Sequence, residues 1–230
     1  MSQLLEAIEM ETGGNPAVSI IWMHGLGADG NDFVPIVQEL DLSKAPPIRF
    51  IFPHAPMQPV TINNGYVMRA WYDVSYGDLE GKSRQADEQG VRASQAAIGK
   101  LIEREMDRGI SSENMVLAGF SQGGAIALQT GLRYPRPLAG VMALSTYLPL
   151  AESFADEAAP ANAKTPIFMA HGTQDPVVPH AMGSKSKELL GTMGYRVEWH
   201  EYPMQHSVCL EEIRDISAWL EKTLGTEIRP

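Results

Sequence analysis

Ser121 stands at the centre of Gly119-Phe120-Ser121-Gln122-Gly123, a stretch that matches the pattern G-x-S-x-G. The apolar run Met115–Gly119 precedes it and an alanine-rich stretch follows it. A serine on a sharp turn between a strand and a helix points its hydroxyl clear of the sheet, and glycines two positions away let the two elements approach closely. The short pattern can arise by chance as a glycine–serine turn, but the strand–turn–helix setting favours a nucleophilic serine that transfers acyl groups.

A serine hydroxyl is a poor nucleophile unless a base removes its proton and a third group orients that base. Where a strand–turn–helix motif carries the serine, the acid follows it in the chain and the histidine comes last. Asp175 lies between the predicted strand Ile167–Ala170 and a proline, and His206 lies in the loop after the predicted strand Arg196–Tyr202. We therefore predict that Ser121, Asp175 and His206 act as nucleophile, acid and base.

Other acids and histidines are weaker candidates because of where they fall in the predicted elements. The competing acids lie in an alanine-rich segment or within the last helix: Asp156, Glu157, Glu211 and Asp215. Two histidines precede a glycine at a strand end and are predicted to be structural turn formers: His24 and His171. The remaining histidines lie in loops or inside a strand: His54, His180 and His200.

The negative oxygen that forms during acyl transfer needs hydrogen-bond donors that are already in place. One donor should be the backbone N–H of Gln122, and the second should come from a loop after an early strand. The glycine-rich loop His24–Gly30 follows the predicted strand Val18–Met23, and we nominate the N–H of Leu26. A phosphate-binding loop is the alternative, but neither G-x-x-x-x-G-K nor a spaced G-x-G-x-x-G occurs there.

The elements that must position these residues alternate between short apolar runs and longer amphipathic ones. The predicted strands are Val18–Met23, Ile48–Phe52, Met115–Gly119, Gly140–Leu144, Ile167–Ala170 and Arg196–Tyr202. The predicted helices are about Asp32–Leu40, Ala86–Arg108, Gln122–Tyr134, His180–Met193 and Ser207–Leu224. This alternation predicts a single α/β domain over residues 1–230, with a mostly parallel sheet, helices on both faces and a peripheral N-terminal segment at 1–16.

Two connections, Pro53–Gly77 and Ser145–Thr165, are long and unusually apolar for loops. Ligands of parallel sheets bind beyond the carboxyl ends of the strands, where such connections lie. We therefore expect both connections to lie beside the substrate.

The composition is that of an ordinary globular protein of 230 residues, 44% of them hydrophobic and 20% charged. Lys and Arg number 18 and Asp and Glu number 28, so the formal net charge of −10 argues against a nucleic-acid partner. The single cysteine, Cys209, excludes an intrachain disulfide, and Met1–Met10 has no basic residue to mark a secretory signal, so we expect a cytoplasmic protein. The uncharged run Asn114–Leu132 is long enough to span a membrane, but its glycines and polar residues favour a strand, a turn and a helix without membrane insertion.

Together these motifs resemble the bacterial carboxylesterase family of the α/β-hydrolase fold, which also includes acyl-protein thioesterases and lysophospholipases. The resemblance covers about residues 18–210 and rests on six stretches: His24–Phe33, Phe52–Pro56, Arg69–Asp73, Gly119–Gly124, His171–Val178 and His206-Ser207. It implies the same triad and oxyanion donors as the motifs do: Ser121, Asp175, His206, Leu26 and Gln122. It adds three residues that would line the acyl side of the cleft: Trp71, Tyr72 and Leu148. It also suggests a homodimer.

One position departs from the family's usual pattern. The residue before the catalytic histidine is commonly glycine in that family and is Gln205 here. Glutamine adopts a positive φ less readily than glycine, so the path of the histidine loop is left open by the resemblance.

We expect a serine carboxylesterase that hydrolyses short- to medium-chain acyl esters through an acyl-enzyme on Ser121, with a small-molecule acyl ester as its substrate. An acyl-protein thioesterase or a lysophospholipase would use the same triad and stays open as an alternative. A non-catalytic binding module of this fold should lack a triad residue, and none is missing; a dienelactone hydrolase would have Cys at position 121. The sequence has no H-E-x-x-H pattern or Cys/His cluster and implies neither a metal nor a nucleotide cofactor.

This chemistry predicts an acid limit to the activity. His206 must be neutral to accept the proton of Ser121, so kcat/KM for an acyl ester should fall as the pH drops through roughly 6–7. Initial rates measured between about pH 4 and about pH 8 test this expectation. A profile that stays flat down to the acid end would contradict a histidine base.

Overall fold

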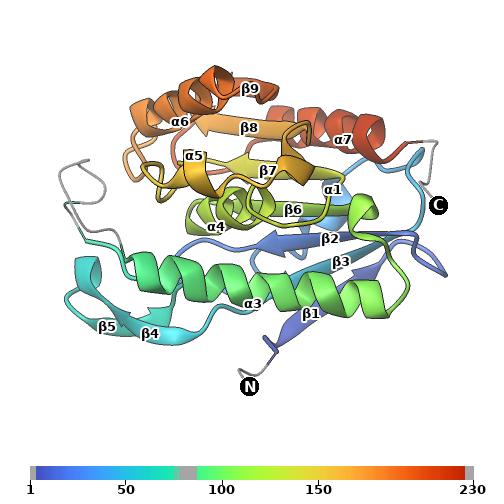
Figure 1. Cartoon of the computed structure of the whole chain (residues 1–230), viewed down its shortest axis with the longest axis horizontal. Helices are drawn as coiled ribbons and strands as arrows, with labels where there is room; N and C mark the ends of the chain where they lie inside the picture. Colours follow the sequence, from blue (N-terminus) through green and yellow to red (C-terminus); the bar gives the residue numbers. More distant parts are fainter. Residues whose placement is uncertain (1–3, 76, 78–86, 226–230) are drawn as a thin grey trace.

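The computed structural model describes residues 4–75, 77 and 87–225, and its centre is a twisted sheet flanked by helices (Figure 1). Within these residues the main sheet has the strand order β1-β3-β2-β6-β7-β8-β9. β1 is antiparallel to β3, and every other neighbouring pair is parallel. The strands are β1 (Ala7–Glu11), β2 (Val18–Met23), β3 (Ile48–Pro53), β6 (Met115–Phe120), β7 (Gly140–Leu144), β8 (Ile167–Gly172) and β9 (Val197–Tyr202).

Helices cover both faces of this sheet (Figure 1). One face packs against α1 (Ile36–Glu39) and α7 (Leu210–Leu224). The opposite face packs against α3 (Glu88–Asp107), α4 (Gln122–Gly131), α5 (Phe154–Glu157) and α6 (His180–Thr192). Short 3-10 turns lie at η1 (Thr61–Asn63), η2 (Ser112–Asn114) and η3 (Pro160–Asn162). The chain therefore has the α/β-hydrolase architecture that its strand–helix alternation predicts.

β2 shows why the central strands are mostly apolar. Its Ile20 and Trp22 side chains pack towards α1 and α7, whereas Ile21 and Met23 pack towards α3 and α4. Successive side chains of a strand point to opposite faces, so a strand covered on both faces favours apolar residues on both; Ser19 is the polar position of β2, and its hydroxyl is hydrogen-bonded to Glu105.

The six predicted strands are all present, with ends within two residues of those expected. The predicted helix Asp32–Leu40 is largely wrong: successive turns occupy residues 29–35, and only Ile36–Glu39 is α-helical. The last helix begins at Leu210 and not at Ser207, because the backbone of Cys209 is still extended (φ −112°, ψ 165°). Ala86, the expected start of the long helix, lies outside the described residues.

The uncharged run Asn114–Leu132 forms β6, a tight turn and α4, as its composition predicts. Among the described residues, no helix combines the length and apolar character needed to cross a membrane.

The N-terminal segment expected at 1–16 contains a strand that was not predicted, because residues 7–11 form β1 at the edge of the main sheet. Its Ile8 and Met10 pack against the core on the α1 and α7 side. Glu9 and Glu11 alternate with them, and acidic residues are poor strand formers by propensity alone. Their charges are balanced by arginines from other elements, which a local pattern does not reveal.

A second unpredicted feature is the antiparallel hairpin of β4 (Met57–Val60) and β5 (Tyr66–Arg69), within the long connection Pro53–Gly77. It lies at the end of the molecule towards which the parallel strands point (Figure 1). The N–H of Gly27 donates to the Arg69 carbonyl (2.9 Å), so the hairpin is attached to the glycine-rich loop.

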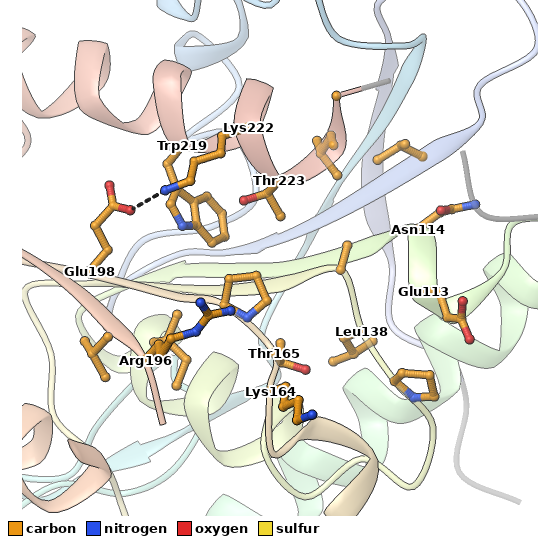
Figure 2. Close-up of a pocket in the computed structure, with 18 of the residues that line it drawn as sticks. Glu113, Asn114, Leu138, Lys164, Thr165, Arg196, Glu198, Trp219, Lys222 and Thr223 are labelled. Carbon is orange, nitrogen blue, oxygen red and sulfur yellow. Dashed lines mark ion pairs between the residues drawn. The ribbon is translucent and has the colours of Figure 1, made fainter. Parts of the chain in front are cut away.

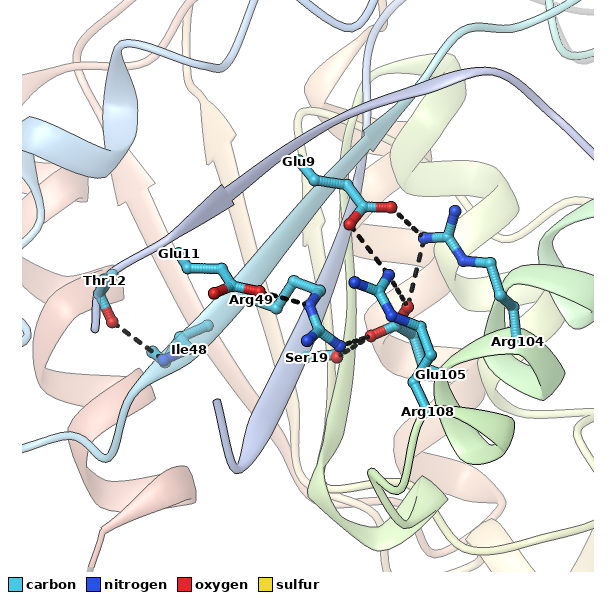
Figure 3. Close-up of polar contacts among 9 residues, drawn as sticks. All are labelled: Glu9, Glu11, Thr12, Ser19, Ile48, Arg49, Arg104, Glu105 and Arg108. Atoms are coloured by element: carbon cyan, nitrogen blue, oxygen red, sulfur yellow. Dashed lines mark hydrogen bonds and ion pairs between the residues drawn. The ribbon is translucent and has the colours of Figure 1, made fainter. Parts of the chain in front are cut away.

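Glu105 of α3 ties the helix to the β1 side of the sheet through a buried ionic cluster (Figure 3). Its carboxylate accepts hydrogen bonds from Ser19 of β2 (2.7 Å) and from Arg49 of β3 (2.8 Å). Arg108 lies 2.9 Å from both Glu105 and Glu9 of β1. Burial by itself would raise the pKa of Glu105, but the hydrogen bonds from Arg49 and Ser19 and the positive charges of Arg108 and Arg49 together outweigh it and hold the pKa below its ordinary value.

Removing this carboxylate should destabilise the fold. Glu105→Gln removes the buried carboxylate that pairs with Arg49 and Arg108 and leaves Arg49 with the more exposed Glu11 as its ionic partner, so the free energy of unfolding should fall by about 3 kcal/mol at pH 7, measured by urea denaturation. Because the pKa of Glu105 is lower in the folded state, its carboxylate stabilises the fold at pH values above the unfolded-state pKa and loses this contribution as the pH falls. The difference in free energy of unfolding between the parent protein and Glu105→Gln should therefore narrow below about pH 4.5.

The matched control is Glu88→Gln on the same helix, which removes an exposed ion pair with Arg92. It should cost at most about 0.5 kcal/mol. Equal, small decreases in the free energy of unfolding of Glu105→Gln and Glu88→Gln would mean that the Glu105 cluster does not anchor α3.

Candidate active site

Ser121 occupies the sharp turn between β6 and α4, with φ 54° and ψ −121°. This is a region that L-residues rarely adopt, and the turn holds it there because the Ser121 N–H donates to the Leu144 carbonyl of β7 (2.8 Å). A Cβ on Gly119 would lie 2.3 Å from the carbonyl carbon of Gly123, and one on Gly123 would lie 2.3 Å from the Met23 carbonyl oxygen. Both glycines are thus required for the close approach of strand and helix, as the motif predicts.

The three residues predicted to act together do meet in the structure. The His206 Nε2 lies 2.9 Å from the Ser121 Oγ, and the His206 Nδ1 lies 2.6 Å from the Asp175 Oδ2. They come from the ends of three strands, β6, β8 and β9, which are far apart in the sequence but share one edge of the sheet.

Asp175 is fixed by its own loop. Its other oxygen, Oδ1, accepts the N–H groups of Val177 (2.8 Å) and Val178 (2.9 Å), and its side chain is fully buried. A carboxylate held in this way can only accept, so the His206 Nδ1 donates to it and the Nε2 is left to accept from the Ser121 hydroxyl. The arrangement can therefore move a proton from Ser121 to His206.

Of the two predicted oxyanion donors, Gln122 directly follows the serine and Leu26 belongs to a loop that passes beside it. A Cβ on Gly25 would lie 3.5 Å from the Ser121 Cβ, so the glycine-rich loop passes beside the nucleophile. Gly27 has φ 78°, and the Ala28 N–H closes a turn on the Gly25 carbonyl. Within the part of the chain that the structure describes, the N–H groups of Leu26 and Gln122 have no hydrogen-bond acceptor. Both are free to bind a developing negative oxygen.

The side chains of Trp71, Tyr72 and Leu148 are all buried, at 1%, 3% and 5% exposure. The hydroxyl groups of Tyr72 and Tyr147 are 3.0 Å apart, so the two long apolar connections meet at this point. The Trp71 indole points inward and donates to the His24 carbonyl (2.9 Å). A role in binding the acyl chain stays a prediction for these residues.

Two other histidines support the loops around the site. The His171 ring contacts the Val178 carbonyl through Nε2 (2.9 Å), and the His24 Nε2 accepts the Ala55 N–H (3.1 Å). Burial lowers the pKa of both imidazoles, so both are neutral at pH 7. Both rings contact backbone groups of neighbouring loops, and their role as turn formers stays a prediction.

The competing acids with resolved partners are engaged elsewhere. Hydrogen bonds from Arg92 and Arg133 lower the pKa of Glu157 to about 2. Asp215 accepts the Tyr202 hydroxyl (2.7 Å). Neither carboxylate contacts the triad.

Gln205 fits the histidine loop without backbone strain. It is not among the described residues with positive φ, so no glycine is needed before His206 in this chain. The glycine that this loop does require is Gly172 of β8, because a Cβ there would lie 2.4 Å from the carbonyl oxygens of Met204 and Gln205.

A cavity of about 950 Å³ lies at the opposite edge of the sheet (Figure 2). It is lined by the first residues of β2, β8 and β9 and by the last turn of α7, and it contains the Lys222–Glu198 ion pair (3.6 Å). It includes none of the predicted site residues. In residues 4–75, 77 and 87–225, no three His, Cys, Asp or Glu side chains are placed to hold a metal ion.

Residues 6–224 match the phospholipase/carboxylesterase family. The chain belongs to this family. This places the chain among the serine hydrolases that act on carboxylic esters. The fold, the turn at Ser121 and the neighbouring histidine and aspartate agree with that class.

Family relatives include acyl-protein thioesterase 1 of Neurospora crassa, which is 43% identical over 213 residues, 90% of this chain and 86% of the relative. Acyl-protein thioesterase 1 of Mycosarcoma maydis is 42% identical over 237 residues, 96% of this chain and 97% of the relative. The crystal structure of Zea mays acyl-protein thioesterase 2 superposes with a TM-score of 0.82 at 28% identity, covering 96% of this chain and 99% of that one.

These relatives refine the resemblance drawn from the motifs. The phospholipase/carboxylesterase family is as expected, but its bacterial branch is not supported, because the similar curated proteins are fungal. The contacts of the Gln122 side chain with the Trp71–Tyr72 backbone were also not foreseen. The motif marks position 122 only for its backbone N–H, and nothing in the local pattern says where its side chain points.

The close approach at Gly123 gives a sharp test of the turn. Gly123→Ala should push α4 away from the Met23 carbonyl and misplace Ser121 and the Gln122 N–H, lowering kcat for an acyl ester by about 100-fold or more. Gly99→Ala, in the open interior of α3, is the matched control; it should leave kcat unchanged and raise the free energy of unfolding by about 0.5–1 kcal/mol. Full activity of Gly123→Ala would show that the turn tolerates the extra atom.

Proposed function

We propose that this chain is a serine thioesterase that removes acyl chains from protein cysteines through an acyl-enzyme on Ser121. The observation that carries the proposal is the Ser121–His206–Asp175 hydrogen-bond chain, in a chain 41–43% identical to fungal acyl-protein thioesterases. Asp175 and His206 act as the orienting acid and the base, and Leu26 and Gln122 bind the oxyanion.

In the first step, His206 takes the hydroxyl proton while the Ser121 oxygen attacks the acyl carbonyl carbon. The carbonyl oxygen becomes negative and is held by the N–H groups of Leu26 and Gln122. Asp175 stabilises the imidazolium and keeps the ring oriented. Collapse of the tetrahedral intermediate breaks the carbon–sulfur bond and leaves the acyl group on Ser121.

A thioester suits this site because thiols are far more acidic than alcohols, with an ordinary pKa near 8.5. The thiolate leaves with less help from the imidazolium than an alkoxide needs, and it takes up the His206 proton as it departs as a thiol, which returns His206 to its neutral form. Water then attacks the acyl-serine with His206 again acting as the base, and the carboxylic acid and free Ser121 are released.

The surface beside the site supports an acyl chain as part of the substrate. Met57 and Val67, on one face of the β4–β5 hairpin, are 58% and 52% exposed, and Tyr66, on its other face, is 70% exposed. Exposed large apolar side chains on a hairpin that is bonded to the glycine-rich loop are typical of a segment that contacts an apolar ligand.

A carboxylesterase that acts on short- to medium-chain esters is the second candidate, and a lysophospholipase is related to it. The same triad serves both, and the family name includes both classes of ester. The leaving group is what separates them from a thioesterase.

The triad and the leaving group can be tested together. Rates are measured on a peptide with an S-palmitoyl cysteine, on the matched peptide with an O-palmitoyl serine, and on nitrophenyl esters of increasing chain length. The S-acyl peptide should have the highest kcat/KM. A preference for short nitrophenyl esters, with no turnover of the S-acyl peptide, would favour the carboxylesterase and overturn the thioesterase.

Ser121→Ala should lower kcat by roughly 10⁴-fold or more and abolish labelling by a fluorophosphonate probe, and Asp175→Asn should lower kcat by about 10⁴-fold. The exposed Ser43→Ala variant is the control and should label and turn over like the parent. Labelling that persists in Ser121→Ala would place the nucleophile elsewhere.

A further inference from the structure

The side chain of Gln122 makes two hydrogen bonds that its role as an oxyanion donor does not require. Its Oε1 accepts the Trp71 N–H (2.8 Å), and its Nε2 donates to the Tyr72 carbonyl (2.7 Å). The side chain is almost completely buried, at 4% exposure for the residue. The amide thus pairs with the backbone of the 71–72 segment from a position directly after the nucleophile.

Trp71 carries the connection onward to the glycine-rich loop. Its indole Nε1 donates to the His24 carbonyl (2.9 Å), and its ring packs against the His24 imidazole with centroids 5.3 Å apart. The His24 carbonyl lies two residues before Leu26 in the chain. Gln122, Trp71 and His24 therefore form a continuous buried link, here called the brace, between the two oxyanion donors.

The brace is itself held in place. Ser94 of α3 donates its hydroxyl proton to the Trp71 carbonyl, so both backbone polar groups of Trp71 are bonded. His24 is anchored on its far side by the Ala55 N–H. Such a fully satisfied, buried network has little freedom to move.

Such rigidity matters because the two donors belong to different elements. The Leu26 N–H comes from a loop after β2, whereas the Gln122 N–H is the first of α4. Both must lie about 2.7–3.1 Å from one oxygen atom to stabilise the transition state. Near Leu26 the loop is partly exposed, so a tie to the buried α4 side of the site fixes the spacing of the donors.

We propose that the Gln122 side chain and Trp71 are positioning residues that set the distance between the Leu26 and Gln122 N–H groups. This inference rests on the proposed hydrolysis and deepens it, because it assigns the Trp71 side chain to the oxyanion hole and not to the acyl chain. The reactive atoms touch only the backbone N–H groups; the side chains act through them.

The first test is Gln122→Met, which keeps the backbone N–H and the side-chain length but removes the amide. We expect kcat to fall about 10–100-fold with KM changed less than about threefold. The affinity for a boronic acid that forms a tetrahedral adduct on Ser121 should fall by the same factor as kcat. Gln129→Met is the matched control, because Gln129 is buried on the same helix and bonds to Gln95 and not to the brace. It should lower stability but leave kcat and boronic acid affinity within about twofold.

The second test is Gln122→Glu, which does not depend on how well the methionine variant folds. When protonated, the glutamate can accept from the Trp71 N–H and donate to the Tyr72 carbonyl as the glutamine does; when ionised, it cannot donate. The ratio of variant to parent kcat should therefore rise as the pH is lowered from about 8 to about 6. A ratio independent of pH would contradict the donor role of the amide.

Trp71→Phe removes the indole N–H that bonds to the His24 carbonyl and so interrupts the brace between Trp71 and His24. Combined with Gln122→Met, it should add little further loss of kcat, because both substitutions interrupt one chain of contacts. Parent-like kcat and boronic acid affinity in Gln122→Met, with Ser121→Ala inactive, would contradict the positioning role of the brace but not the proposed hydrolysis. A parent protein that neither turns over acyl substrates nor reacts at Ser121 would instead overturn the proposed function.

Discussion

The positive φ of Ser121 is the constraint around which the active-site edge is built. A side chain in this conformation projects away from both the strand before it and the helix after it, but the backbone adopts it only when its surroundings enforce it. The enforcement comes from packing at backbone level: β2, β6 and α4 approach so closely at Gly119 and Gly123 that a single methyl group would overlap a carbonyl. The same close contact brings the loop after β2 beside the serine.

Given that turn, the remaining parts of the site follow from the geometry of a parallel sheet. The carboxyl ends of β6, β8 and β9 lie along one edge, so the loops after them carry Ser121, Asp175 and His206 to one place. The amino ends of the strands form the opposite edge, where the cavity beside α7 lies. The hydrolase chemistry of the family is thereby confined to one side of the molecule.

Buried polar contacts link this edge to the rest of the fold. The Glu105 cluster fixes the C-terminal half of α3 against β1, β2 and β3, and Ser94 of the same helix bonds to Trp71 beside the oxyanion loop. A buried carboxylate is costly unless it is paired, and here several donors from separate elements share it. α3 thus acts as a rigid support that runs from the sheet edge to the active site.

The sequence alone determined the features that depend on local patterns. The six parallel strands, the turn at Ser121 and the order of serine, aspartate and histidine follow from apolar runs, glycine spacing and the chain order of a known motif.

What only the tertiary structure decided are contacts between distant segments. β1 contains two glutamates, and Arg49, Arg104 and Arg108 from other elements pair with them at the sheet edge. The β4–β5 hairpin and the inward turn of Trp71 depend on partners in the Leu26 loop and on α4. Spacing along the chain carries no information about these partners, because their stabilisation arises only once the sheet has brought them together.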